Sequence, residues 1–331
     1  MTARLLQPLT IRSMLLNSRL VMPPMATAKA APVGTVSPEI LAYYREKAAG
    51  GYFGLIVIEH SYVSPEGKAS ARQLSAAEDG VVPGLRELAQ IIHAAGTKAV
   101  VQLSHAGSAT TPEIIGTTPL APSPILNPRK GSWPTEMEAA DIARVVEAFA
   151  QAAHRCREAG FDGVEIHSAH GYLLNQFYSP LTNQRTDEYG GDWEGRIRIH
   201  LEIIRAVRSA VGPDFPIFLR LGASDFRKGG TTIEDSKLAA IKFVAAGVDV
   251  IDVSGGFCGY VHPEDQGQGY FAGLAEAIRG QVSVPVILTG GVTEAAAAER
   301  LLHEGKADLI GVGRAVMADS GWAQRAVESL R

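Results

Sequence analysis

Cysteine is nearly absent from this sequence of 331 residues, which contains only Cys156 and Cys258. Because the two never form a Cys-x-x-Cys pair, an iron–sulfur cluster or a structural zinc site built on thiolates is excluded. A disulfide is not expected in a reducing compartment. Cys156 falls on an apolar helical stripe and is therefore interpreted as a small core residue, whereas Cys258 lies in a glycine-rich loop.

An excess of charge and long apolar runs are also missing. The formal net charge is −4, which gives no basic surface for nucleic acid and no polybasic segment for a membrane. No stretch approaches the roughly 20 apolar residues of a membrane span. The N-terminal residues lack a long apolar segment followed by a small-residue cleavage site. We therefore expect a cytoplasmic protein that binds neither nucleic acid nor a membrane.

Glycine is abundant instead, with 35 residues, and hydrophobic residues make up 46% of the chain. Such a chain can bury a large core and form many tight turns. Short, nearly continuous apolar runs alternate with longer helical patterns, as expected for parallel strands that are buried on both faces. The eight runs lie at 19–26, 53–60, 97–105, 161–167, 215–221, 248–255, 284–291 and 307–314.

This alternation is compatible with an open doubly wound sheet or a closed barrel. Eight units of even size, without Gly-x-Gly-x-x-Gly after the first strand, favour an α/β fold of the (β/α)8 TIM-barrel type. No linker-like change of composition interrupts residues 1–331, so we predict a single domain. Residues 5–19 are expected to form a short hairpin that plugs the barrel bottom. The segment 108–137, after the third strand, contains six prolines, and a loop of this length is typical of a lid.

Two helix patterns are clear enough to predict their ends. Residues 138–160 carry apolar side chains at steps of three and four, after a capping box formed by Thr135 and Glu138. Residues 193–212 form a second helix with Asp192 as its N-cap. The apolar face of this second helix is expected to contain Trp193, Ile197, Leu201 and Ile204.

A barrel of this type carries its functional site at the carboxyl ends of the strands. The residues found there are Met25, Ala26, Glu59, His60, Gln102, His105, His167, His170, Tyr172, Arg220, Ser254, Gly290, Gly291, Gly313 and Arg314. The glycines and Arg314 follow the last two strands, where this fold often binds phosphate. The alternative is that the paired glycines only form tight turns.

His167 and His170 allow three interpretations. They could bind zinc, with Glu59 or Asp252 as a third ligand, although no His-Glu-x-x-His motif supports this. They could satisfy backbone groups at a strand end. The favoured interpretation is a pair of donors directed at one electronegative oxygen, with Tyr172 close by as an acid.

Arg220 and Gln102 also end strands of the predicted barrel. A buried arginine needs an anion or a developing negative charge. The alternative partner for Arg220 is the carboxylate of Asp225 or Asp252, in an ion pair. Gln102 offers both a donor and an acceptor, which suits the edge of a heterocycle. Its alternative is a bond to a neighbouring strand end.

Residues 167–191, HSAHGYLLNQFYSPLTNQRTDEYGG, closely resemble the signature of the Old Yellow Enzyme family of FMN-dependent ene-reductases and NAD(P)H:flavin oxidoreductases. Other segments resemble strands of that family: NSRLVMPPMAT, IEHSYVSPEGK, VVQLSHAG, LRL at 219–221, LTGGV and IGVGRAVMAD. The resemblance covers nearly the whole chain. It implies a barrel that holds FMN noncovalently at its top and receives hydride from NADH or NADPH.

The resemblance also implies roles for individual residues. Gln102 would bond the pyrimidine edge of the flavin, and Arg220 would stand near N1 and the C2 carbonyl. The residues lining the flavin through backbone groups would be Pro24, Met25, Ala26 and His60, with Pro23 also at the cofactor. The residues holding the phosphate would be Gly290, Gly291, Gly313 and Arg314.

The implied reaction reduces the C=C bond of an α,β-unsaturated carbonyl compound. His167 and His170 would bind the carbonyl oxygen, and Tyr172 would donate a proton to the α-carbon. A homo-oligomer is possible. One alternative is a non-redox barrel lyase or isomerase acting on a phosphorylated substrate. Another is a flavin-binding protein of low turnover, because Ala26 replaces a Cys or Thr that commonly touches the flavin in the family.

Overall fold

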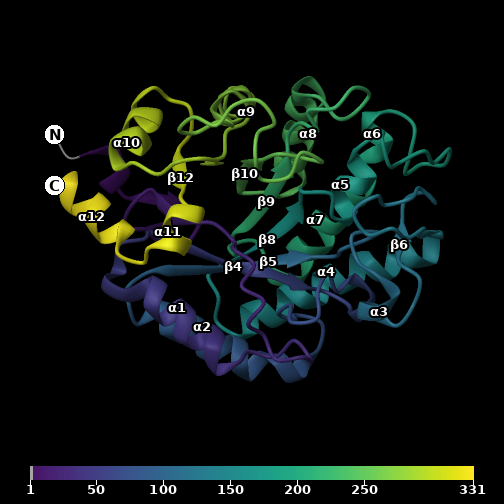
Figure 1. Ribbon diagram of the computed structural model, residues 1–331, viewed down its shortest axis with the longest axis horizontal. Helices are drawn as coiled ribbons and strands as arrows, with labels where there is room; N and C mark the ends of the chain where they lie inside the picture. Colours follow the sequence, from purple (N-terminus) through teal and green to yellow (C-terminus); the bar gives the residue numbers. More distant parts are fainter. Residues whose placement is uncertain (1–2) are drawn as a thin grey trace.

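Eight parallel strands close into a barrel at the centre of the computed structural model, which describes residues 3–331 (Figure 1). In order around the barrel they are β3 (Leu20–Met22), β4 (Leu55–Tyr62), β5 (Lys98–Ser104), β8 (Gly163–Ser168), β9 (Ile217–Gly222), β10 (Val250–Ser254), β11 (Val286–Thr289) and β12 (Leu309–Gly311). The pairing of β12 with β3 closes the barrel. The predicted TIM barrel and its eight predicted strands are confirmed. The first two residues of the predicted domain 1–331 lie outside the described residues.

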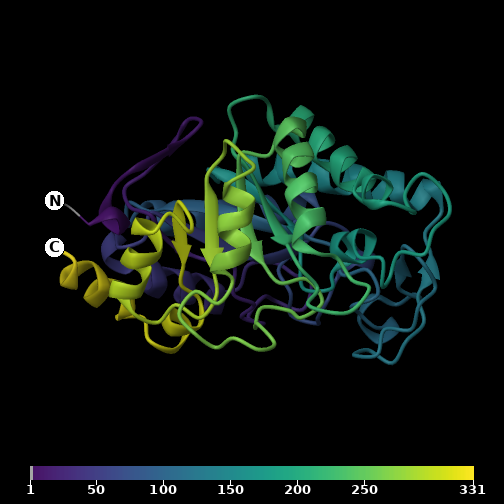
Figure 2. The ribbon, with the colours of Figure 1, turned by 90° about the horizontal axis from the view of Figure 1, so that it is seen from above.

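Helices connect successive strands and cover the outside of the barrel (Figures 1 and 2). They are α1 (Pro38–Ala48), α2 (Val82–His93), α4 (Ala139–Glu158), α7 (Arg198–Val211), α8 (Ile233–Ala246), α9 (Ala272–Arg279) and α10 (Ala295–His303), followed after β12 by α11 (Arg314–Ala318) and α12 (Trp322–Ser329). Shorter elements are η1 (Arg4–Leu6), η2 (Ala49–Gly51), η3 (Pro65–Gly67), η4 (Asp79–Val81), α3 (Pro112–Ile115), α5 (Leu173–Tyr178) and α6 (Trp193–Arg196). Within residues 3–331, we find no helix with the length and apolar character needed to cross a membrane.

An N-terminal hairpin seals one end of the barrel. Strands β1 (Leu9–Ile11) and β2 (Met14–Leu16) pair antiparallel, and the hairpin projects to one side of the barrel in Figure 2. Its buried side chains pack in one apolar cluster with the innermost side chains of the barrel strands. That cluster contains Ile11, Met14, Leu16, Val21, Leu55, Val57, Val100, Phe218, Val250, Ile287 and Leu309. The predicted hairpin plug is therefore confirmed.

Helix α4 has the predicted apolar stripe but not the predicted cap. Its buried residues include Ile142, Phe149 and Cys156. The capping box is formed by Glu138 and Asp141, and the backbone N–H of Glu138 donates to the Asp141 carboxylate at 2.8 Å. The predicted box with Thr135 is wrong, because Thr135 belongs to β7 (Thr135–Glu136), which pairs with β6 (Leu120–Ala121).

The second predicted helix is interrupted. Asp192 caps α6 as predicted, and its carboxylate accepts the backbone N–H of Gly195 at 3.0 Å. Ile197 keeps right-handed helical angles (φ −93°, ψ −2°) but forms a single turn residue between α6 and α7, which begins at the next residue. The predicted apolar face is confirmed, because Ile197 and Ile204 are buried and the half-buried Trp193 and Leu201 pack against the same core. The side chains that α7 buries are Ile199, His200, Ile203, Ile204, Val207 and Val211.

A bulge in β4 decides which side chain faces the barrel interior. The register of β4 against β5 shifts between Ile58 and Ser61. Glu59 does not line the central cavity, and its carboxylate accepts the hydroxyl groups of Thr27 at 2.6 Å and of Tyr44, on α1, at 3.5 Å. His60 lines the central cavity instead. Bulges commonly re-aim side chains in this way next to functional sites.

Candidate active site

A cavity of about 990 Å³ opens at the carboxyl ends of the barrel strands. Its volume is at the upper end of the roughly 300–1,000 Å³ found for small-molecule sites. Every predicted site residue lines it: Pro23, Pro24, Met25, Ala26, His60, Gln102, His167, His170, Tyr172, Arg220, Gly290, Gly291, Gly313 and Arg314. His105, another predicted strand-end residue, is buried outside this lining and accepts the backbone N–H of Gly107 at 3.1 Å.

Three aromatic side chains gather on one wall of the cavity. His167 is on β8, and His170 and Tyr172 lie in the turn between β8 and α5. The ring centroids of His167 and His170 are 5.2 Å apart, with the rings nearly perpendicular. The centroids of His167 and Tyr172 are 4.8 Å apart. His170 has a φ of 61°, so the turn holds this residue in the left-handed region.

The ring nitrogens of the two histidines differ in their partners. His170 Nε2 lies 2.8 Å from Ser254 Oγ on β10, which orients the ring, and no described residue is hydrogen-bonded to Nδ1. His167 Nδ1 is buried and has no partner within residues 3–331. Buried polar nitrogens are normally hydrogen-bonded, so this wall suits a ligand that carries a hydrogen-bonding group.

Burial controls the protonation of this wall. It lowers the pKa of both His167 and His170 well below the ordinary value, and the nearby charge of Arg220 lowers both further. Both imidazoles are therefore neutral near pH 7, and each has one N–H donor. Burial also raises the pKa of Tyr172 to about 12. The phenol consequently keeps its proton throughout the physiological range.

His60 extends the same wall with a defined tautomer. The side-chain carbonyl of Gln73 accepts the backbone N–H of Ala69 at 2.6 Å, so its amide nitrogen faces His60 Nδ1 at 2.7 Å. Since an amide nitrogen can only donate, Nδ1 accepts, and the proton of the neutral ring is on Nε2. Burial lowers the pKa of His60 to about 4. The ring centroid is 5.5 Å from that of Tyr172. The sequence predicted only a backbone role here.

The zinc interpretation of His167 and His170 needs a third ligand. The Glu59 carboxylate accepts the Thr27 hydroxyl at 2.6 Å, and Asp252 is bonded to Arg220. In the described part of the chain, no group of three or more His, Cys, Asp or Glu side chains could hold a metal ion. The geometry therefore favours the alternative in which the two histidines bind a small molecule.

Arg220 and Gln102 lie on the cavity floor, each bonded to a buried carboxyl group. Arg220 Nη1 donates to Asp252 at 2.8 Å, as one sequence interpretation expected, but its buried Nε has no partner among the residues that the structure describes. Gln102 Nε2 donates to Glu165 at 2.7 Å. The sequence analysis missed Glu165, although its alternation with His167 along β8 places both on one face of the strand. Asp225, the other proposed partner of Arg220, instead accepts the Ser179 hydroxyl at 2.6 Å.

Arg314 and the paired glycines form the far end of the cavity, together with Tyr270. Arg314 Nη2 donates to the Tyr270 hydroxyl at 3.0 Å. A Cβ on Gly290 would lie 2.7 Å from the Tyr270 ring, and Gly291 has a φ of +69°. Close packing therefore requires glycine here, whether or not phosphate binds. No periodic pattern in the sequence marked Tyr270.

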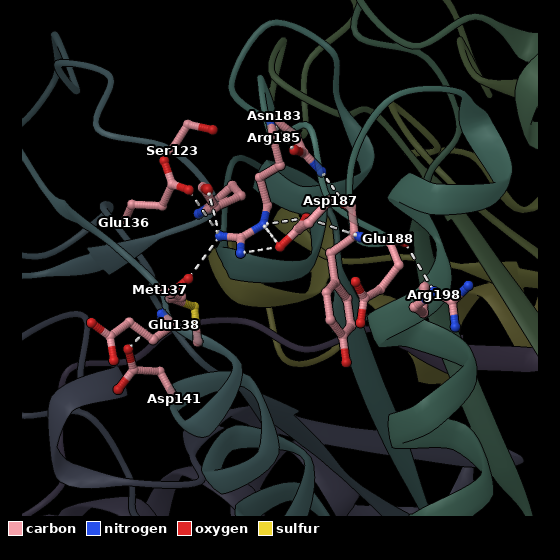
Figure 3. Close-up of polar contacts among 12 residues, drawn as sticks. Ser123, Glu136, Met137, Glu138, Asp141, Asn183, Arg185, Asp187, Glu188 and Arg198 are labelled. Carbon is pink, nitrogen blue, oxygen red and sulfur yellow. Dashed lines mark hydrogen bonds and ion pairs between the residues drawn. The ribbon is translucent and has the colours of Figure 1, made fainter.

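The segment 108–137 is anchored beside the cavity by Arg185 (Figure 3). The Arg185 guanidinium donates to the carbonyl oxygens of Pro122 and Met137, at 3.0 and 2.7 Å. It also pairs with Asp187, whose carboxylate accepts Nε at 2.9 Å. The arginine side chain is only 6% exposed. It therefore joins the predicted lid segment to the loop that follows α5.

One residue of this segment reaches the cavity. Arg129 lines it and donates to the carbonyl oxygen of Phe257, in the loop after β10, at 3.3 Å. The segment therefore bounds the site, which is compatible with the predicted lid, but its closure stays a prediction.

Replacing Arg185 with methionine is expected to lower the free energy of unfolding by about 3 kcal/mol, because two carbonyl groups and a carboxylate lose a buried partner. Denaturant unfolding measures the change, and limited proteolysis should cut within residues 108–137. The control Arg198→Met removes an exposed arginine that donates to the Glu188 carbonyl (Figure 3). Its stability should change by less than about 0.5 kcal/mol. Equal stability of both variants would show that Arg185 is not an anchor.

A barrel cavity that combines neutral donors with arginines at its floor and far end defines a class: barrel enzymes that bind an anionic or phosphorylated small molecule. The profile of the NADH:flavin oxidoreductase / NADH oxidase family matches residues 4–331. The chain is 43% identical over 324 residues to an NADH oxidase from Thermoanaerobacter brockii. The matched region covers 96% of this chain and 50% of the oxidase. The chain thus spans about half the length of that relative.

Two further matches cover nearly the whole of this chain and of the protein with which it is compared. The chain is 39% identical over 332 residues to an NADPH dehydrogenase from Bacillus subtilis (strain 168), covering 100% of this chain and 96% of that protein. The fold matches an old yellow enzyme homologue from Zymomonas mobilis with a TM-score of 0.86 and 25% identity, covering 98% of this chain and 92% of that one.

The chain therefore belongs to the NADH:flavin oxidoreductase / NADH oxidase family, the Old Yellow Enzyme family of oxidoreductases that use FMN and NAD(P)H. The predicted family and cofactors are confirmed. Membership in this family also argues against the lyase or isomerase alternative.

Proposed function

We propose that this chain uses FMN and NADH or NADPH to reduce the C=C bond of α,β-unsaturated carbonyl compounds. The observation that carries the proposal is the wall formed by His167, His170 and Tyr172, where neutral N–H donors and a protonated phenol lie beside each other. These groups suit an acceptor whose oxygen gains negative charge while a neighbouring carbon gains a proton.

The residues of the cavity fit FMN. The bond from Gln102 to Glu165 leaves the Gln102 carbonyl free to accept an N–H of the pyrimidine edge. The unpartnered Nε of Arg220 is a donor for an acceptor on that same edge. Bound FMN supplies the redox chemistry, taking hydride from NAD(P)H and passing it to the acceptor. The ring would be lined by Pro23, Pro24, Met25, Ala26 and His60, and the phosphate would be held by Gly290, Gly291, Gly313 and Arg314.

His167 and His170 bind and polarise the acceptor. Both rings are neutral near pH 7, so each can donate one N–H to the carbonyl oxygen without exchanging its proton. His170 uses its Nδ1–H for this purpose, with the Ser254 hydroxyl donating to Nε2 of the neutral ring. Two preorganised donors withdraw electron density from the β-carbon and stabilise the enolate-like charge that develops on the oxygen.

Tyr172 supplies the proton. Its ring lies 4.8 Å from His167, so an acceptor held by the histidines has its α-carbon near the phenol. The raised pKa keeps the hydroxyl protonated. The proton moves from Tyr172 Oη to the α-carbon while the oxygen remains bound to the imidazoles, and solvent then restores the phenol.

The test is a sequence of three measurements on the purified protein. It should be yellow, release FMN on denaturation, and lose its flavin colour when NADH or NADPH is added without oxygen. A panel of enones should then restore the colour. A colourless protein that does not bind added FMN would refute the proposal. Bound FMN that NAD(P)H never reduces would instead favour the flavin-binding protein of low turnover.

A further inference from the structure

A polar layer spans four neighbouring strands of the barrel below the cavity. Gln102 on β5, Glu165 on β8, Arg220 on β9 and Asp252 on β10 are at most 3% exposed. Gln102 donates to Glu165 Oε2, and Arg220 donates to Asp252 Oδ2. Thr289 on β11 completes the layer by donating to Asp252 Oδ1 at 3.3 Å. Only Gln102, Arg220 and Thr289 line the cavity, so the two carboxyl groups lie behind them.

The layer contains one carboxyl oxygen that lacks a hydrogen-bond donor, and it contains two carboxyl groups but only one positively charged side chain. Glu165 Oε1 is buried and receives no hydrogen bond from residues 3–331, whereas both oxygens of Asp252 accept one. If both carboxyl groups were ionised, the single guanidinium of Arg220 would leave a net negative charge in the dry interior, which is strongly unfavourable. A proton on Glu165 Oε1 resolves both problems, because this oxygen then becomes a donor directed toward Asp252.

We propose that Glu165 is a positioning residue that stays a neutral carboxylic acid in the folded protein and thereby fixes how Gln102 and Arg220 meet the cofactor. The inference rests on the proposed function, in which these two side chains contact FMN. Neutral Glu165 accepts from Gln102 through one oxygen, so the Gln102 carbonyl faces the cavity. It also leaves Asp252 as the sole counter-charge of Arg220.

The surroundings of Glu165 support this protonation state. The pKa of Glu165 is raised to about 8, mainly by burial and then by the charge of Asp252, while Arg220 opposes the rise. Burial also raises the pKa of Asp252. The remaining neighbours, Gln102 and Thr289, are uncharged. His167, on the same strand, is neutral because burial lowers its pKa. Above about pH 8, a second negative charge therefore appears beside Arg220.

Glu165→Gln is the matched variant, since its amide can accept from Gln102 and donate to Asp252 as the protonated acid does. We expect the FMN dissociation constants of wild type and variant to agree within about threefold at pH 6. At pH 9.5 the wild type should bind FMN about tenfold more weakly than the variant, which corresponds to one pKa unit of interaction. Likewise, the midpoint potential of flavin bound to wild type should be lower than that of flavin bound to the variant only above about pH 8.

Two measurements on the FMN-free proteins test the protonation itself. The infrared spectrum at pH 6 should contain a protonated-carboxyl band that Glu165→Gln removes, and this band should vanish from the wild type above about pH 9. Because the folded pKa exceeds the unfolded one, wild type loses stability as pH rises from about 4.5 to about 8. The ratio of the folding equilibrium constant of the variant to that of wild type should therefore rise by up to tenfold per pH unit in this window. Glu87→Gln, at an exposed site on α2, should show neither effect.

Asp252→Asn provides an independent variant. Removing the neighbouring negative charge should shift the loss of the Glu165 infrared band to lower pH. The proposal would be overturned if wild type had no such band at pH 6. It would also be overturned if FMN binding and stability depended on pH in the same way in wild type and in Glu165→Gln. A protonated Glu165 whose replacement leaves FMN binding and potential unchanged at every pH would overturn its positioning role while the proposed function stands. Failure of wild type to bind FMN would overturn both.

Discussion

The Tyr172→Phe protein is expected to be reduced by NAD(P)H at the wild-type rate and to be reoxidised by enones about 10²–10⁴ times more slowly. The expected loss is the usual contribution of a positioned general acid. It is confined to the oxidative half-reaction because only the α-carbon of the acceptor needs the phenolic proton. The two imidazoles and the cavity floor are unchanged, so the binding of phenol ligands should change little.

Anaerobic stopped-flow absorbance separates the two half-reactions. Ferricyanide, an oxidant that needs no protonation of carbon, should reoxidise Tyr172→Phe as fast as wild type. Tyr52→Phe is the matched control, because Tyr52 packs against the core and does not line the cavity. Equal slowing of reduction and reoxidation would show that Tyr172 does not act as the proton donor.

Replacing both His167 and His170 with alanine should weaken carbonyl and phenol ligands by at least about 10²–10³-fold. This range corresponds to the loss of two hydrogen bonds to an oxygen that carries negative charge, each contributing about 1.5–3 kcal/mol. The affinity for FMN should change by less than about fivefold, because the proposed flavin contacts come from other strands. The double asparagine variant should recover part of the ligand affinity, since an amide N–H can replace an imidazole N–H.

Titration of a substituted phenol against the flavin absorbance measures ligand binding, and fluorescence of released FMN measures cofactor loss. If the alanine variant lost FMN while retaining the phenol affinity, the placement of the two histidines against the acceptor would be wrong.

Much of the barrel could be predicted because strands buried on both faces have nearly continuous apolar sequences. The hairpin plug followed from its position before the first strand. The errors lie where two local structures compete for the same residues. Thr135 could cap a helix or pair in a strand, and Ile197 could continue a helix or interrupt it. Tertiary contacts decide both, and a single sequence does not contain them.

The site residues could be located because the carboxyl ends of barrel strands converge. Their partners could not, since hydrogen bonds such as Gln102–Glu165 and Arg220–Asp252 depend on register between strands. Tyr270 comes from an irregular loop with no periodic pattern. The roles of the site residues, the single domain, the oligomer and the cytoplasmic location stay predictions.

The bulge in β4 gives this cavity an unusual route of evolutionary change. It turns Glu59 outward and His60 inward, and deletion of His60 would restore the regular alternation along β4 and bring Glu59 to the inward position. A single codon loss would thus replace an imidazole by an acid near the proton donor and leave every other strand untouched. Substrate preference could therefore shift from neutral toward cationic acceptors without any rebuilding of the scaffold.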